Sequence, residues 1–173
     1  YYGGAYAGSW TYGIPEIHVV REKISGSTRI ANPGCYATAI ELGLAPLLAA
    51  NSVDAKDIIV VAASGTSGAG RGAKVNLLNS EVAGSMSAYK VGGTHQHTPE
   101  IEQTLSKLAG TEVQINFTPM LAPMPRGILA TISVKTELGG AKLREAMIDY
   151  YAGEAFVTVL PEGQLPVTAS TLG

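Results

Sequence analysis

An uninterrupted apolar run at residues 57–63 (DIIVVAA) restricts the fold more than any other feature of the sequence. After its first residue the run contains isoleucine, valine and alanine, without the alternation of polar and apolar residues that marks a strand with one solvated face. Continuous β-branched runs of this length are typical of strands covered on both faces. We therefore expect a strand that is buried on both faces and runs into the glycine-rich turn at residues 64–72.

The remaining segments mix strands and helices. Strand-like patterns occupy residues 17–22, 25–31, 112–118, 128–136 and 156–160, and residues 85–91 are expected to be extended. Apolar residues and good helix formers predict helices over 37–50, 73–82, 101–108 and 141–151. Because strands and helices do not alternate strictly, the order favours an α+β fold over a doubly wound α/β fold. A length of 173 residues suits one domain of ordinary size.

Charge and hydropathy argue against two classes of function. The chain has 12 basic and 14 acidic residues and no basic run, so nucleic-acid binding is not expected. No apolar stretch approaches the roughly 18 residues of a membrane helix, and no signal peptide is visible. With one cysteine and no targeting segment, we expect a reducing cytoplasm. The chain does not begin with methionine, which is compatible with a piece of a longer protein.

Cys35 is the single cysteine and has no partner for an internal disulfide. Pro33 and Gly34 interrupt the chain just before it, and the helical pattern of residues 37–50 follows. Unpaired N–H groups and the helix dipole favour an anion at such a position, which lowers the pKa of a thiol there. Free cysteines are also common as small buried apolar residues. From this segment alone, a nucleophile and an inert thiol both remain open.

Histidines supply the partner that a cysteine nucleophile needs. His95 and His97 stand two residues apart in a glycine-rich loop, so in an extended segment they project to the same side. One of them can face the thiol while Glu100 orients it, and metal binding by the pair is the alternative. His18 lies in a strand-like run and is expected to be structural or on the surface.

Two arginines are candidate ligands for an anion. Arg71 follows the glycine-rich turn after the apolar strand, where backbone N–H groups can contact an anion, although a plain tight turn is equally open. The turn has neither a dinucleotide-binding nor a P-loop spacing. Arg126 stands between a proline and a glycine, and its alternative is an ordinary surface arginine. A cysteine, a histidine and arginines together suit acyl transfer from an anionic, activated carboxyl compound.

Six segments in a fixed order carry a family signature: WTYGIPE at 10–16, IANPGCYATA at 30–39, SGTSGAGR at 64–71, YKVGGTHQHTPEI at 89–101, RGILAT at 126–131 and PEGQLP at 161–166. In this order they resemble the N-acetyl-γ-glutamyl-phosphate reductases of arginine biosynthesis. Aspartate-semialdehyde dehydrogenase is the nearest sister family, and the paired histidines favour the first. A non-catalytic phosphate-binding or oligomerisation module is the alternative from another class.

The resemblance implies an α+β fold like the C-terminal domain of glyceraldehyde-3-phosphate dehydrogenase, with a mostly antiparallel sheet and helices on one face. Residues 1–173 would form the substrate-binding, catalytic domain, and the NADP-binding Rossmann domain would be absent from the chain. The expected substrate is N-acetylglutamyl phosphate, and a homodimer or homotetramer is the expected assembly. We expect negligible turnover from the chain alone.

The resemblance also implies roles for individual residues. Cys35 would attack the acyl phosphate and form a thioester, His97 would act as the acid–base partner, and Glu100 would orient it. Substrate contacts are expected from His95, Arg71, Arg126, Ser67, Gly68, Ala69 and Tyr12. Pro33 and Gly34 are expected to face the nicotinamide of NADP, and no metal ligands are expected.

Overall fold

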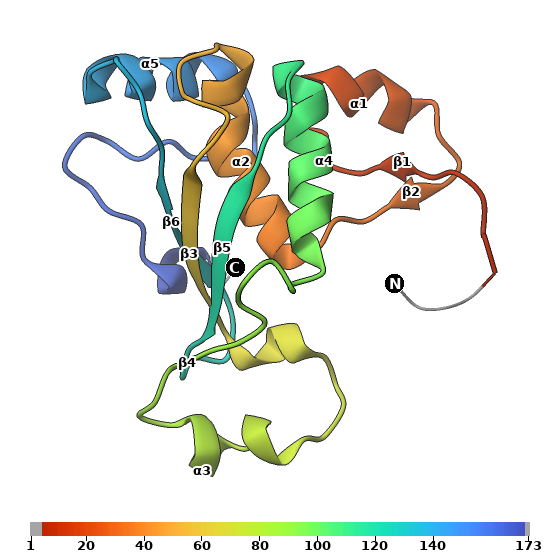
Figure 1. The fold of residues 1–173 in the computed structure, drawn as a ribbon, viewed down its shortest axis with the longest axis vertical. Coiled ribbons are helices and arrows are strands. Elements are labelled where there is room, and N and C mark those ends of the chain that lie inside the picture. Colours follow the sequence, from red (N-terminus) through yellow and green to blue (C-terminus); the bar gives the residue numbers. More distant parts are fainter. Residues whose placement is uncertain (1–4, 172–173) are drawn as a thin grey trace.

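A four-stranded mixed sheet lies at the centre of the computed structural model, which describes residues 5–171 (Figure 1). Its strands lie in the order β4 (Ser87–Ala88), β5 (Ile115–Leu121), β3 (Ile58–Ser64) and β6 (Ile128–Ser133). β3 pairs in parallel with β5 and antiparallel with β6, while β4 pairs antiparallel with β5. The predicted α+β fold is confirmed. The sheet is mixed: two of its three strand pairs are antiparallel, and the parallel pair β3–β5 stands in its middle.

Two helices form the layer that covers the sheet. α2 (Cys35–Ala49) and α4 (His97–Ala109) pack against each other, α2 also contacts β6, and α4 contacts β5. The main core lies between these helices and the sheet, and Ile40, Leu44, Val60 and Ile101 are fully buried in it. α5 (Gly140–Tyr150) packs on α2, as Figure 1 shows at the upper end of the sheet. Helices over 37–50, 101–108 and 141–151 are confirmed to within a few residues.

β3 is buried on one face only, so the expectation of burial on both faces is wrong. Ile58, Val60 and Ala62 face the helices, whereas Ile59 and Val61 are 52% and 40% exposed. Leu129 of the neighbouring β6, opposite Ala63 in the register, is exposed on the same side. A continuous apolar run indicates that both faces of a strand are apolar. It does not indicate whether other residues of the same chain cover the second face.

α2 contains a proline, and the structure compensates for it. Pro46 has no N–H group, so the carbonyl of Leu42, four residues earlier, loses its helical partner. The hydroxyl of Tyr151, just after α5, donates a hydrogen bond of 2.5 Å to that carbonyl. The side chain of Tyr151 is buried. The contact therefore satisfies the helix interruption and attaches the end of α5 to α2.

The N-terminal region is a helix where a strand was expected. Residues 17–22 belong to α1 (His18–Ser25), because Ile14, Ile17 and Val20 follow at three-residue steps and pack together beside α2. α1 connects β1 (Thr11–Tyr12) to β2 (Ile30–Ala31), which pair in parallel. The second expected strand at 25–31 is thus reduced to its last two residues.

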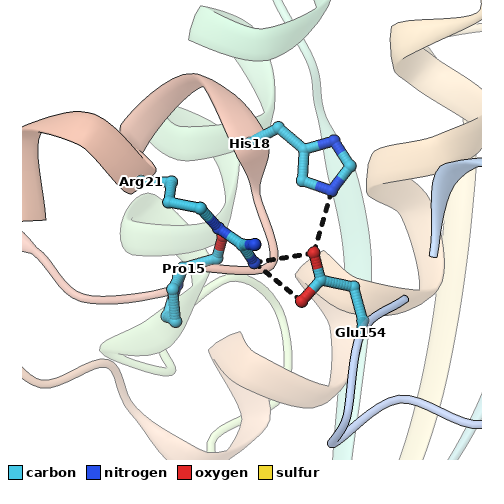
Figure 2. A network of polar contacts seen from close by, with 4 residues as sticks. All are labelled: Pro15, His18, Arg21 and Glu154. Atoms are coloured by element: carbon cyan, nitrogen blue, oxygen red, sulfur yellow. Dashed lines mark hydrogen bonds and ion pairs between the residues drawn. The ribbon is translucent and has the colours of Figure 1, made fainter. Parts of the chain in front are cut away.

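α1 is attached to the segment after α5 by a polar network, which Figure 2 shows. Both carboxylate oxygens of Glu154 accept hydrogen bonds from the Arg21 guanidinium, at 2.6 and 2.7 Å. His18 lies 3.1 Å from the same carboxylate and stacks on the ring of Tyr150. Arg21 also donates to the carbonyl of Pro15. His18 therefore has a structural contact at the surface, as its sequence context suggests.

Loops between β3 and β5 project from the end of the sheet that lies below α4 in Figure 1. They contain the 3₁₀ turns η1 (Thr66–Ala69) and η2 (Val75–Leu77) and the short helix α3 (Asn79–Val82). The single helix expected over 73–82 does not form, because no residue of η2 or α3 is buried and packing does not support a longer helix there.

The strand expected over 156–160 is also absent from the described residues. Phe156 is 92% exposed, and no strand of the sheet pairs with this segment. Apolar residues without a neighbouring strand edge do not form a ladder. The chain ends in loops followed by η3 (Thr168–Thr171), in agreement with the loop expected from residue 161 onward.

Candidate active site

Cys35 is the first residue of α2, and its side chain is exposed. Gly34 precedes it in an extended conformation, with no side-chain cap on the helix start. The N–H groups of the first turn are therefore available to an anion. The expectation that Cys35 stands at a helix N-terminus is confirmed, and an inert buried thiol is excluded by the exposure.

Cys35 opens into a cavity of about 610 Å³. Its walls come from the start of α2, the end of β3 with η1, the segment around η2, and the loop that leads into α4. The lining includes Cys35, Tyr36, Ser64, Gly68, Ala69, Lys74, Tyr89, Lys90, His95 and His97. Both histidines of the expected pair thus share one cavity with the cysteine, although they lie 60 or more residues later in the chain.

His95 is held as a neutral imidazole. Its Nδ1 accepts a hydrogen bond of 3.1 Å from the backbone N–H of His97, so this nitrogen carries no proton and the ring carries it on Nε2. Tyr36, Tyr89 and Phe117 pack around the ring in edge-to-face contacts. Burial lowers the pKa of His95 to about 4. His95 can therefore donate a hydrogen bond through Nε2, but it cannot take up a proton on Nδ1 without losing the amide contact.

His97 begins α4 and lies against Gly34. A Cβ built at Gly34 would stand 2.2 Å from Nε2 of His97, so only glycine leaves room for the ring. Nδ1 of His97 is buried and has no hydrogen-bond partner among the described residues. Burial also lowers the pKa of His97. The ring nitrogens of His97 are thus free of the constraint that fixes His95.

Glu100 makes contacts that differ from the expected one. Its Oε1 accepts a hydrogen bond of 2.9 Å from the backbone N–H of Gly34 and one of 2.8 Å from the hydroxyl of Tyr12. Within residues 5–171, no hydrogen bond joins Glu100 to His97. Glu100 therefore holds the residue before Cys35. Tyr12, which was expected to contact substrate, lies behind the cavity in this network and does not line it.

The residues that were expected to bind an anion do not all line one cavity. Arg126 and Ser67 line a neighbouring cavity of about 360 Å³, which shares Lys74 and Leu77 with the first. Arg71 lines neither cavity. The N–H of Ser67 donates to the carbonyl of Pro125 and is therefore occupied. Gly68 and Ala69 do line the cavity of Cys35, as expected.

Sequence reasoning missed the two cations that line the Cys35 cavity, Lys74 and Lys90. Lys90 has a positive φ of 45°, which is uncommon for a residue with a side chain. Its ammonium group donates to the side-chain oxygen of Gln96. The one sequence signal that could have identified Lys90 as a cavity residue is its position in the segment that also contains both histidines.

Pro33 and Gly34 were expected to face a nicotinamide. Pro33 does not line the cavity, and the space beside Gly34 is filled by the ring of His97. No cluster of three or more His, Cys, Asp or Glu residues that could hold a metal is found within residues 5–171. None of the helices in that range combines the length and apolarity that a bilayer crossing requires.

Comparison with known proteins identifies the family of this chain. Residues 35–173 match the family model described as semialdehyde dehydrogenase, dimerisation domain. The chain is 59% identical over its full length to the N-acetyl-γ-glutamyl-phosphate reductase of Acidothermus cellulolyticus, covering 51% of that protein. It is 58% identical over 99% of its length to the enzyme of the same name from Frankia casuarinae, again covering 51%. The chain thus spans about half the length of the curated relatives it matches.

Solved structures support the fold. Aspartate semialdehyde dehydrogenase II from Vibrio cholerae, complexed with ASA, superposes with a TM-score of 0.66 at 16% identity, over 94% of this chain and 54% of that one. A probable aspartate-semialdehyde dehydrogenase from Pseudomonas aeruginosa gives a TM-score of 0.63 at 16% identity, over 98% and 56%. The family model, which matches residues 35–173 as the dimerisation domain, shows that the chain belongs to the semialdehyde dehydrogenase family.

Proposed function

We propose that this chain supplies the substrate-binding and thioester-forming part of an NADP-dependent N-acetyl-γ-glutamyl-phosphate reductase. The observation that carries the proposal is the position of Cys35, exposed at the start of α2 in one cavity with His95 and His97. The names of the relatives at 58–59% identity support the choice of N-acetylglutamyl phosphate over aspartyl phosphate. The resemblance of the solved structures concerns the fold alone.

Cys35 acts as the nucleophile. Its thiolate attacks the acyl carbon of N-acetylglutamyl 5-phosphate, the carbon–oxygen bond to the phosphate breaks, and inorganic phosphate leaves with the bonding electron pair. The product is a thioester on Cys35. The N–H groups at the start of α2 stabilise the negative charge on the carbonyl oxygen during the attack. NADPH, when bound by a part of the protein outside this chain, supplies the hydride for reduction.

The two histidines have different tasks. His97 accepts the proton of the Cys35 thiol and returns one to the oxygen of the thiohemiacetal, because its ring nitrogens are not fixed by a backbone contact. His95 donates from Nε2 to the substrate, since its Nδ1 is occupied. When the carbon–sulfur bond of the thiohemiacetal breaks, the hydroxyl proton passes back to His97, N-acetylglutamate 5-semialdehyde leaves, and the bonding electron pair stays on sulfur as the thiolate. Glu100 acts on Gly34 instead of orienting His97.

The anionic ends of the substrate are bound by lysines. Lys74 and Lys90 line the cavity and can neutralise the phosphate and the α-carboxylate. Arg126 can assist from the neighbouring cavity, which shares Lys74 with the first. Arg71 has no such position, so we assign it no contact.

We also propose that the protein works as a cytoplasmic homo-oligomer. The exposed apolar face formed by Ile59, Val61 and Leu129 pairs with a second copy, and the description of the family domain as a dimerisation domain supports this. A homodimer needs one such face per chain, and a homotetramer needs a second surface.

The test is a substrate comparison with the enzyme at its full natural length. The reverse reaction is followed as NADPH formation from the semialdehyde, phosphate and NADP, with N-acetylglutamate semialdehyde and with aspartate semialdehyde. We expect turnover with the first and a loss of turnover in Cys35→Ser. A thioester on Cys35, detected as a mass increase after mixing with the acyl phosphate, identifies the intermediate. Preference for aspartate semialdehyde would assign the sister activity, and full turnover by Cys35→Ser would exclude the thioester mechanism.

A further inference from the structure

A fully buried carboxyl group lies behind the cavity, on the same helix as Cys35. Glu41 of α2 has 0% exposure. Its Oε1 lies 3.0 Å from the hydroxyl of Tyr12, and the same hydroxyl lies 2.8 Å from Oε1 of Glu100. Oε1 of Glu100 also accepts the N–H of Gly34 at 2.9 Å. One continuous chain of hydrogen bonds therefore runs from Glu41 to the residue before Cys35.

Counting hydrogens gives this chain a direction. The Tyr12 hydroxyl has one hydrogen, so it can donate to Glu41 or to Glu100, and the other carboxyl must donate to the phenolic oxygen. Oε1 of Glu100 already receives the Gly34 N–H and acts as an acceptor. Glu41 is therefore the carboxyl that carries a proton. The bonds run from Glu41 to Tyr12, from Tyr12 to Glu100, and from Gly34 to Glu100.

The surroundings of Glu41 agree with a protonated carboxyl. Its Oε2 makes no hydrogen bond among the described residues, because the one hydroxyl beside Glu41 other than that of Tyr12, the hydroxyl of Thr104, donates to the backbone carbonyl of Glu100. Ionisation would therefore place a buried charge where the nearby Thr104 donor is already engaged. The ionisable groups that face it are Tyr12 on β1 and Glu100 on α4, with the hydroxyl of Thr104 nearby, and none of these is a cation. Burial, and then the negative charge of Glu100, raise the pKa of Glu41 to about 8.

We propose that Glu41 is a positioning residue: it keeps its proton and donates it to Tyr12, so that Tyr12 and Gly34 both donate to Glu100 and Cys35 is held in place. No part of Glu41 touches the cavity. The effect of Glu41 on the reaction rests on the proposed function of Cys35. The protonation state of Glu41 does not depend on that function.

Two substitutions of similar length separate positioning from stability. In Glu41→Gln the side-chain N–H₂ can still donate to Tyr12, whereas in Glu41→Met no donor remains and an apolar chain fills the space. In Glu41→Met the hydroxyl of Tyr12 keeps Glu100 as its acceptor, so no buried donor is left without a partner, and Glu41→Met is expected to fold. We expect Glu41→Gln to alkylate Cys35 within about twofold of the wild-type rate, and Glu41→Met to be about tenfold or more slower, because a small displacement of a reacting group is costly.

The second readout is the pH dependence. Above pH 8 the wild type loses the Glu41 proton, two carboxylates then repel each other across Tyr12, and kcat falls. Glu41→Gln has no proton to lose and is expected to keep its plateau. The folded-to-unfolded ratio gives a second measure of the same proton. The pKa of Glu41 is raised in the folded state, so its contribution to stability falls as pH rises from about 4.5 to 8. The buried histidines act in the opposite direction below about pH 6.5, so between pH 6.5 and 8 the ratio should fall by up to about tenfold per pH unit. This decrease is expected to vanish in Glu41→Gln and to persist in Glu137→Gln, the exposed control.

The measurements use the full-length protein: alkylation of Cys35 by iodoacetamide, kcat against pH, and unfolding in urea at several pH values. The proposal is overturned if Glu41→Met folds and alkylates at the wild-type rate, or if Glu41→Gln keeps the alkaline decrease of the wild type. If Glu41→Met does not fold, the comparison of Glu41→Gln with wild type over pH decides alone. If the wild type has no reductase activity, the proposed function fails, while alkylation and the stability slope still test Glu41.

Discussion

The imidazole of His97 occupies the space that a side chain at Gly34 would need: a Cβ added to Gly34 would stand 2.2 Å from Nε2 and 2.5 Å from Cε1. Gly34 immediately precedes Cys35 at the start of α2, and His97 begins α4. The same Gly34 donates its N–H to Glu100 on the first turn of α4. Two contacts of Gly34, the residue next to Cys35, therefore fix the starts of both helices relative to each other.

Gly34→Ala is expected to displace the His97 ring. Contacts at 2.2–2.6 Å cannot be tolerated, so either the ring or the loop before Cys35 must move. A displacement of about 1 Å can lower turnover by about a hundredfold, and we expect a loss of this order in kcat with a smaller change in KM. Steady-state kinetics of the full-length enzyme measure it.

Gly139→Ala is the matched control, because a Cβ there meets nothing within 4 Å. It is expected to retain wild-type kinetics. If Gly34→Ala also retains them, with folding verified by circular dichroism, the contact with His97 has no part in the reaction.

Local patterns in the sequence predict the helix that carries Cys35, but not the network behind it. Pro33, Gly34 and the apolar run after them predict a helix start at Cys35, because breaker and helix-former signals are local. Glu100 and Gly34 are 66 residues apart, and no local signal indicates that one bonds the other. The sequence predicts Arg71 as an anion ligand, yet it lies in an exposed loop. The direction of this loop depends on hydrogen bonds from residues 65–67 to residues 124–127.

Lys90→Ala is expected to weaken substrate binding. Lys90 is one of two lysines that line the cavity, and removal of a cation that binds an anionic substrate group is expected to raise KM about tenfold or more, with a smaller effect on kcat. The effect should diminish at high ionic strength, because salt screens the interaction. Lys142→Ala on α5 is the control with equal loss of charge and no place in the cavity. An equal rise in KM for both variants would show that the effect is one of net charge.

His95 makes stability depend on pH in the acidic range. Burial lowers the pKa of His95 to about 4, below the 6.5 of the unfolded chain, so the unfolded state binds a proton first as pH falls. The contribution is full above pH 6.5 and is lost progressively towards pH 4, by at most about 1.4 kcal/mol per pH unit. The buried His97 acts in the same direction.

Urea unfolding of the wild type and of His95→Asn between pH 4 and 7.5 measures this dependence. The asparagine oxygen can still accept the N–H of His97, but it does not titrate. Both proteins share the opposite contribution of Glu41, so the variant should lose less stability than the wild type when the pH falls from 6.5 to 4. Equal slopes in the two proteins would assign the acid sensitivity to other groups.

Tyr151→Phe is expected to destabilise the fold without touching the active site. The variant leaves the carbonyl of Leu42 without a partner, because Pro46 cannot supply one. An unsatisfied buried acceptor costs about 1–3 kcal/mol. Tyr6→Phe removes a hydroxyl that bonds Ser9 at the exposed surface, and it should change the unfolding free energy by less than about 0.5 kcal/mol. Chemical denaturation compares the two, and a Tyr151→Phe protein as stable as Tyr6→Phe would mean that another group satisfies the carbonyl.

Val61→Asp is expected to dissociate the assembly. Val61 lies in the middle of the exposed face of β3, between Ile59 and the position opposite Leu129, and three large apolar side chains on one sheet face are costly to leave in water. An unpaired carboxylate in the centre of an interface should weaken association by about a hundredfold or more. Val19→Asp on α1 is the control, since Val19 is 62% exposed outside the sheet. Size-exclusion chromatography with light scattering should give a monomer for Val61→Asp and the wild-type mass for Val19→Asp. A folded Val61→Asp protein with the wild-type mass would place the interface on another surface.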